Sequence, residues 1–308
     1  FRSLVVVSFL SARSLTEPLR TMARATQRIA EGDLNVDLSN IERQDEVGQL
    51  ADAFTKMTED LQKYIKDLTE TTAAKQRIES ELSIAARIQQ SMLPSKFPAF
   101  PERKEFDIYA LMRPAKEVGG DFYDFFLVDE DHLCVVVGDV SGKGVPAALF
   151  MAVTKYLIQA AVGTGEPPEA AMRMVNAHLA RDNESCTFVT IFLGILDLKT
   201  GEFLYANGGH NPPVLAETNY EAAFLGRPGG PVVGIMDDAE FRMDRLVLTP
   251  GALLVIYSDG VTEAFDVNGE AYAVDRLRDA VAAVRAEPAQ TVSNELLKVI
   301  DGFCAGAP

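Results

Sequence analysis

The stretch VVVGDVSGKG, residues 135–144, contains the pattern on which a prediction of the fold depends. Its valines predict a buried strand, and Asp139 follows near the end of that strand with glycines close by on both sides. Burying an unpaired carboxylate costs free energy, so an aspartate at the end of so apolar a strand suggests a partner or a ligand. The neighbouring glycines allow a sharp turn and a close approach of that ligand.

The same pattern occurs twice more. Asp121 lies in VGGDFYDF, residues 118–125, and Asp259 lies in LLVIYSDGVTE, residues 253–263. Any one of these motifs alone favours a turn or capping aspartate, but three in one region favour a shared, oxygen-rich site. Such a site suits Mg²⁺ or Mn²⁺. Two of these ions, about 3.5–4 Å apart, can hold a phosphoryl group and activate a water molecule.

The region around the motifs predicts a mixture of helices and strands. Strands occur in runs instead of alternating strictly with helices, which favours antiparallel pairing in an α+β fold of two packed sheets with helices outside. The expected strands are 106–112, 122–128, 132–138, 187–197, 202–206, 213–216, 245–249 and 252–258, and the expected helices are 144–162, 168–181, 273–285 and 288–303.

The chain begins with the apolar stretch FRSLVVVSFL. A membrane span needs about 20 apolar residues, so this stretch is too short to cross a bilayer alone. We interpret residues 1–10 as the inner end of a transmembrane helix, with the rest of the chain on the cytoplasmic side of the inner membrane. A short buried helix start is the alternative.

Two helical patterns follow. Apolar residues recur at alternating spacings of four and three from Leu15 to Ile29, with Pro18 expected in the first turn of that helix. A second pattern starts near Asp45 and runs to Leu68. Two short amphipathic helices cannot bury both apolar stripes alone, so we expect a homodimer that forms a four-helix bundle.

Residues 11–61 resemble a HAMP domain, the relay module found just inside bacterial membranes. The resemblance depends on Pro18, on EGDL at 31–34 and on DEVGQLADAFTKM at 45–57. From residue 62 the heptad-like rhythm continues with no proline or glycine until Pro94, which predicts a dimeric coiled-coil linker over 62–94.

Residues from about 80 to 308 resemble the SpoIIE-type members of the metal-dependent PPM, or type 2C, serine/threonine phosphatases. We place this domain at 95–308. The motifs that carry the resemblance are IQQSMLP, GGDFYDF, GDVSGKGVPAAL, NGGHNPP at 207–213, and YSDGVTEA.

The phosphatase resemblance implies an αββα sandwich in which Asp121, Asp139 and Asp259 hold two ions, Mn²⁺ or Mg²⁺. The carbonyl of Val140 corresponds to a backbone metal ligand of the family. The resemblance also implies in-line attack by activated water without a phosphoenzyme. The substrate it implies is a phosphorylated STAS-type anti-anti-sigma protein, in a pathway that regulates a sigma factor.

One family motif is absent from the sequence. The family usually supplies a further metal aspartate from DD-x-T on a last strand, and no such motif precedes Pro308. We expect that strand to lie beyond this fragment. The alternative is a catalytically inactive phosphatase fold that serves as a dimeric docking scaffold.

Other side chains near the motifs have less specific signals. Lys143, in a loop beside Asp139, and Arg113 are candidates for binding the substrate phosphate. His210 in NGGHNPP is expected to support a turn. VGGDFYDF also resembles the signature of diguanylate cyclases, but the other two aspartate motifs have no place in that fold. GDVSGKG has one residue too few between its glycines for a P-loop.

The net charge of −16 argues against nucleic-acid binding, because phosphate contacts need clustered Lys and Arg. The acidic surface leaves basic partners and cations open. Three widely separated cysteines, with no zinc spacing, indicate buried thiols in a reducing compartment.

Overall fold

The structure, a computed structural model, describes residues 2–38, 40–41, 43–114, 118–218, 221–226 and 229–307, with side chains from residue 16 onward. The chain forms two compact units, Phe1–Glu81 and Leu82–Pro308. The boundary between them falls within one long helix, α2.

The first unit contains helix α1 (Arg2–Ala30) and the first part of α2 (Glu46–Ser91). A small core forms where the two helices meet the connecting segment, around Met22, Leu38 and Ala51. Because α1 begins at Arg2, Pro18 lies inside the helix, and the prediction that it occupies the first turn is wrong. A proline in a helix interior lacks one backbone donor and tends to kink the helix.

Helix α2 runs without interruption for 46 residues, as expected for a helix that continues into a coiled-coil linker. Within the described unit its apolar side chains lie largely in solvent, with Leu68 67% exposed. They recur at the alternating spacings of a coiled-coil seam. The exposed members are Leu50, Met57, Leu61, Tyr64, Ile65, Leu68 and Ile78.

The second unit contains two antiparallel sheets. The five-stranded sheet has the order β1-β2-β3-β4-β7, and the three-stranded sheet has the order β6-β5-β8. The strands are β1 (Phe122–Leu127), β2 (His132–Val140), β3 (Val189–Asp197), β4 (Glu202–Gly208), β5 (Val214–Ala216), β6 (Ala223–Phe224), β7 (Met243–Val247) and β8 (Leu253–Val255).

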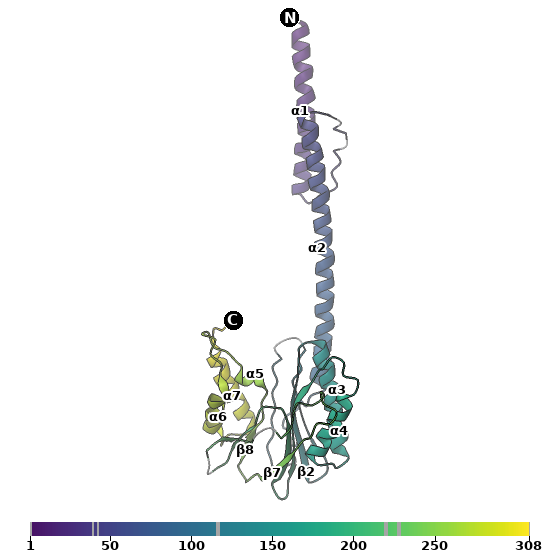
Figure 1. Ribbon diagram of the computed structural model, residues 1–308. Helices are drawn as coiled ribbons and strands as arrows, with labels where there is room; N and C mark the ends of the chain where they lie inside the picture. The colour runs from purple at the N-terminus through teal and green to yellow at the C-terminus, as the bar shows by residue number, and fades with distance from the viewer. Residues whose placement is uncertain are drawn as a thin grey trace. The chain divides into compact units, whose positions relative to one another are not determined.

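Helices cover both sheets. Figure 1 shows α3 (Val145–Gly163) and α4 (Pro168–Ala180) on one side of the strands, with α6 (Ala273–Val284) and α7 (Ala289–Phe303) on the other. Each pair of helices shares a hydrophobic core with its own sheet. The αββα sandwich expected from the sequence is therefore confirmed.

Helix α3 is long and apolar enough to cross a membrane by length and composition, and among the described residues no other helix meets that test. Its side chains Met151 and Ile158 are fully buried and pack in one cluster with Val136 of β2. The apolar character of α3 is therefore explained by its place in the core.

The strand expected at 106–112 does not form. Its alternating apolar residues pack as aromatic contacts instead: Phe106 lies 5.6 Å from Phe100 between ring centroids. Two polar side chains of this segment hold helix α7, because Asp107 accepts a hydrogen bond from the Ala289 amide and Arg113 pairs with Asp301. We call residues 106–113 the α7 strap. The alternating apolar residues of this segment therefore reflect its packing against a helix and aromatic rings, and the segment is not part of a sheet.

A buried ion pair fastens α3 to β1. Lys155 Nζ lies 2.7 Å from Asp124 Oδ2, and the two side chains are only 5% and 4% exposed. Gln159 donates a second hydrogen bond to the same carboxylate, and the Phe125 amide donates to its other oxygen. These donors compensate a charge that would otherwise be costly to bury.

Removing one member of this pair should destabilise the fold strongly. We expect Lys155→Met to lower the free energy of unfolding by about 3–5 kcal/mol, because Asp124 remains buried without its countercharge. The matched control is Lys199→Met, which breaks the exposed pair with Asp131 and should cost less than about 1 kcal/mol. Urea denaturation measures both, and equal effects would contradict this account.

Candidate functional site

The fold brings two of the three expected aspartates together directly. Asp121 immediately precedes β1, and Asp139 is the next-to-last residue of β2. Phe122 pairs with Gly138 in the antiparallel register, so the residues beside them, Asp121 and Asp139, are neighbours at one end of these strands. Asp259 is the first residue of the short helix α5 (Asp259–Thr262), which follows β8 from the other sheet.

The electrostatics show how close these groups are. Burial and, after it, the neighbouring carboxylates of Asp121, Asp259 and Glu263 together raise the pKa of Asp139 to about 8. Asp121 lies within hydrogen-bonding reach of Asp139. Like charges that crowd a partly buried carboxyl oppose its ionisation. The site therefore carries more negative charge than the protein compensates.

Ser258 connects the first and third motifs. Its hydroxyl donates a 2.9 Å hydrogen bond to Oδ2 of Asp121, and Ser258 directly precedes Asp259. The carboxylate of Asp121 is therefore oriented by a side chain 137 positions away in the sequence.

The carbonyl of Val140 also faces this region. A Cβ atom added to Gly120 would lie 2.5 Å from the Val140 carbonyl oxygen, so only glycine fits there. This contact places the backbone before Asp121 directly against the backbone after Asp139. It explains why the first motif needs a glycine at position 120.

The residues present supply hard oxygen donors, the kind that Mg²⁺ and Mn²⁺ prefer. Across the described residues, however, no three His, Cys, Asp or Glu side chains are close enough together to hold one ion. Asp121 and Asp139 form a pair, whereas Asp259 and Glu263 act on it electrostatically. The uncompensated charge of the pair, together with the Val140 carbonyl, fits a divalent cation.

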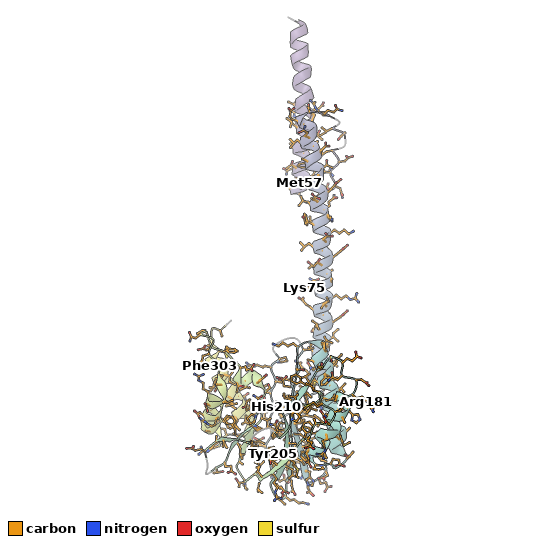
Figure 2. The ribbon with its side chains drawn as sticks, in the orientation of Figure 1. Met57, Lys75, Arg181, Tyr205, His210 and Phe303 are labelled. Atoms are coloured by element: carbon orange, nitrogen blue, oxygen red, sulfur yellow. The ribbon has the colours of Figure 1, made fainter. Side chains whose placement is uncertain are left out.

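A buried histidine lies behind the aspartate pair. Figure 2 places His210 in the interior of the second unit, between its two helix layers. His210 is 2% exposed, and burial lowers its pKa to about 4, which keeps the imidazole neutral. Its Nδ1 lies 2.8 Å from the Thr190 hydroxyl, which in turn lies 3.4 Å from the carbonyl oxygen of Asp139. Asn207 holds the backbone of the turn through both its amide atoms.

The two basic candidates differ in their surroundings. Lys143 is exposed in the loop between β2 and α3, and no ion pair involves it within the described ranges. One terminal guanidinium nitrogen of Arg113, Nη1, donates to both carboxylate oxygens of Asp301 in α7, at 2.9 and 3.0 Å. Arg113 would have to leave that pair to bind a phosphate.

The sequence motifs did not indicate Ser258, Glu263 or Thr190. Glu263 lies in the same motif as Asp259 and follows it by four positions, about one helical turn. Its position near Asp259 could therefore have been predicted from the spacing. Thr190 reaches the site through strand register, which has no local signature: it pairs with Asp139 in the β2–β3 ladder.

Solved structures define the class of the second unit. The SiaA-PP2C domain of Pseudomonas aeruginosa superimposes with a TM-score of 0.66 at 21% identity, covering 77% of this chain and 94% of that one. The RsbU and RsbW domains of a Mycobacterium tuberculosis protein give a TM-score of 0.55 at 26% identity, covering 62% of this chain and 53% of that one. The second unit thus has the PP2C fold.

Comparison with known protein families identifies the family of this chain. Residues 129–308, more than half of the chain, match the family described as Stage II sporulation protein E (SpoIIE), and residues 10–63 match the HAMP domain. The chain belongs to the SpoIIE family and carries a HAMP domain before the PP2C fold.

Curated relatives match the chain over different lengths. Protein IcfG of Synechocystis sp. is 31% identical over 96% of this chain and 50% of its own length. Phosphoserine phosphatase RsbU of Bacillus subtilis is 33% identical over 63% of this chain and 57% of its own length. The chain spans about half the length of the curated relatives it matches.

The raised pKa of Asp139 predicts how stability depends on pH. The unfolded chain releases this proton near its ordinary pKa of 3.8 and the folded chain near 8, so the folded state binds more protons between these values. Stability therefore falls as the pH rises through this window. In the presence of a chelator, we expect Asp139→Asn to melt above wild type at pH 8.5, with a smaller difference at pH 5.5.

Thermal melts across this range measure the effect. Asp238→Asn, an exposed aspartate, serves as the control and should follow wild type. A constant difference between Asp139→Asn and wild type at all pH values would contradict the assignment.

Proposed function

We propose that this chain is a metal-dependent phosphatase of phosphoserine or phosphothreonine proteins, using two Mn²⁺ or Mg²⁺ ions. The observation that carries the proposal is the crowded pair Asp121–Asp139, whose charge is reinforced by Asp259 and left uncompensated by the protein. SpoIIE-family membership and the names of the relatives RsbU and RsbP, both phosphoserine phosphatases, support it.

Bound divalent ions would supply Lewis-acid chemistry, drawing charge from the phosphoryl oxygens and activating water. Asp121, Asp139 and Asp259 would hold them, with the Val140 carbonyl as a backbone ligand. Ser258 fixes the orientation of the Asp121 carboxylate through its hydrogen bond to Oδ2. We assign Lys143 to the substrate phosphate, since it is exposed next to Asp139 on a flexible side chain.

Arg113 is the second candidate for binding the phosphate. The Arg113–Asp301 ion pair is exposed, and exposed ion pairs contribute little free energy. Arg113 can therefore exchange Asp301 for a phosphate dianion with little loss of stability.

The substrate we infer is a phosphorylated STAS-type anti-anti-sigma protein. Relatedness to RsbU supports this class.

We further propose that the HAMP domain and the coiled coil regulate the site from the membrane, as a homodimer on the cytoplasmic face. The exposed seam of α2 supports dimerisation, because a second copy would cover it. HAMP domains also join membrane helices to signalling modules, which agrees with the apolar stretch at 1–10.

The second candidate is an inactive phosphatase fold that acts as a docking scaffold. The observation that favours it is the lack, among the described side chains, of three acidic or histidine groups close enough for one ion. Such a scaffold would bind the phosphoprotein without hydrolysing it.

Hydrolysis of a phosphoserine protein with Mn²⁺ tests the proposal. We expect Asp139→Asn and Asp259→Asn each to lower the rate by more than about a hundredfold, since even outer partners of metal ligands cost about 10–100-fold. Asp238→Asn is the matched control and should leave the rate unchanged. Full activity in both ligand variants would refute the metal site, whereas substrate binding without turnover by wild type would establish the scaffold.

The dimer can be tested separately. Met57→Glu with Leu61→Glu places charge in the exposed seam of α2, and we expect the molecular mass in sedimentation equilibrium to fall from dimer to monomer. Lys56→Glu with Lys63→Glu, at exposed polar positions of the same helix, should leave the dimer intact. A monomeric wild-type chain would rule out this interface.

A further inference from the structure

A short hairpin, residues 264–272, follows helix α5 almost directly. Its two ends are joined by the backbone, because the amide of Tyr272 donates a 2.8 Å hydrogen bond to the carbonyl of Ala264. The hairpin begins immediately after Glu263, whose carboxylate acts electrostatically on Asp139. A protein that presents a phosphorylated side chain to the aspartate pair therefore comes close to this hairpin.

Side chains hold the tip of the hairpin in one conformation. Asp266 Oδ1 accepts hydrogen bonds from the amides of Asn268 and Glu270, at 2.9 and 2.8 Å. Arg276 of α6 donates to the Glu270 carboxylate and lies over the ring of Phe303, which Figure 2 labels. These contacts order the hairpin before any partner binds, which lowers the entropy lost on binding.

The ordered hairpin carries two large apolar side chains in solvent. Phe265 is 54% exposed and Val267 is 60% exposed. One residue separates them, so a single partner surface can cover both. Isolated exposed apolar residues are common, but two of them on a rigid hairpin beside a candidate site fit a docking surface. We call Phe265 and Val267 the hairpin patch.

The charge of the chain indicates how a partner would bind there. The net charge is −16, and Glu263 and Asp266 add negative charge on both sides of Phe265. A phosphoprotein brings further negative charge, so away from bound cations the attraction of opposite charges does not supply its affinity. Apolar contact does not depend on charge and can supply it.

We propose that the hairpin patch is the docking surface for the phosphoprotein substrate, which it binds through apolar residues beside the phosphorylated serine. The inference rests on the proposed function and deepens it, because it names the contact that distinguishes a protein substrate from a small phosphate ester. A small ester can reach the aspartate pair without touching the hairpin, so the patch affects hydrolysis of the protein alone.

The test compares two substrates and two equally exposed valines. The full 308-residue chain is assayed with Mn²⁺ on a phosphorylated STAS-type protein and on p-nitrophenyl phosphate. Phe265→Ser with Val267→Ser should raise KM for the phosphoprotein about tenfold, and Val267→Ser alone about threefold, because apolar burial is lost. Both variants should hydrolyse p-nitrophenyl phosphate as wild type does.

The matched control is Val247→Ser, which should leave KM for both substrates unchanged. Val247 is also 60% exposed, but it pairs with Glu202 at the end of the five-stranded sheet opposite to Asp139. A loss equal to that of Val267→Ser in this control would contradict a local docking surface.

The remaining outcomes are also decisive. An unchanged KM for the phosphoprotein overturns the inference, and so do equal losses on both substrates, which would mean that the hairpin shapes the site. A lower molecular mass of the double variant in sedimentation equilibrium would assign the patch to a second copy of the chain and overturn it too.

Failure of the proposed function can be told apart from failure of the docking surface. If wild type does not hydrolyse the phosphoprotein, the proposed function fails. Titration calorimetry with the same phosphoprotein then decides the inference: binding about tenfold weaker in the double variant supports it. Equal binding, or no binding by wild type, overturns it.

Discussion

The pairing of Lys155 with Asp124 is the interaction on which the geometry of the second unit depends. Both charges are removed from water, which costs free energy. Their attraction offsets this cost only while Gln159 and the backbone complete the hydrogen bonds of the Asp124 carboxylate. This requirement permits few positions of α3 on the sheet. Since α3 follows the loop after Asp139, and Asp124 lies three residues after Asp121, the same ion pair fixes both aspartates of the candidate site.

The charges of Asp121 and Asp139 are treated in the opposite way to the charge of Asp124. Around Lys155 the protein compensates a buried charge, whereas at the ends of β1 and β2 it gathers like charges and leaves them uncompensated. A fold that can satisfy a buried carboxylate completely, yet does not do so at Asp139, holds free energy there that a cation would release on binding.

Features of this arrangement that depend on neighbouring residues could be predicted from the sequence, whereas contacts between distant residues could not. An apolar strand that ends in aspartate beside glycine is a local pattern, so Asp139 and the two-sheet fold were predictable. Ser258 reaches the site across 137 positions, and nothing near this residue indicates its partner. The strand expected at 106–112 failed because alternation also arises when a segment packs on a helix. Pro18 was misplaced because the first helix begins earlier than its periodic stretch.

The α7 strap has a consequence for how this family can vary. Asp107 and Arg113 bind positions 289 and 301, which lie about 18 Å apart along a helix at 1.5 Å per residue. The six steps of backbone between Asp107 and Arg113 reach at most about 20 Å. The backbone reach is thus close to the span, and the side chains of Asp107 and Arg113 add a few ångströms, so the strap runs extended along most of the last helix. The two anchors therefore set a minimum length for this segment, which relatives that keep both anchors should respect, although the residues between them are free to change.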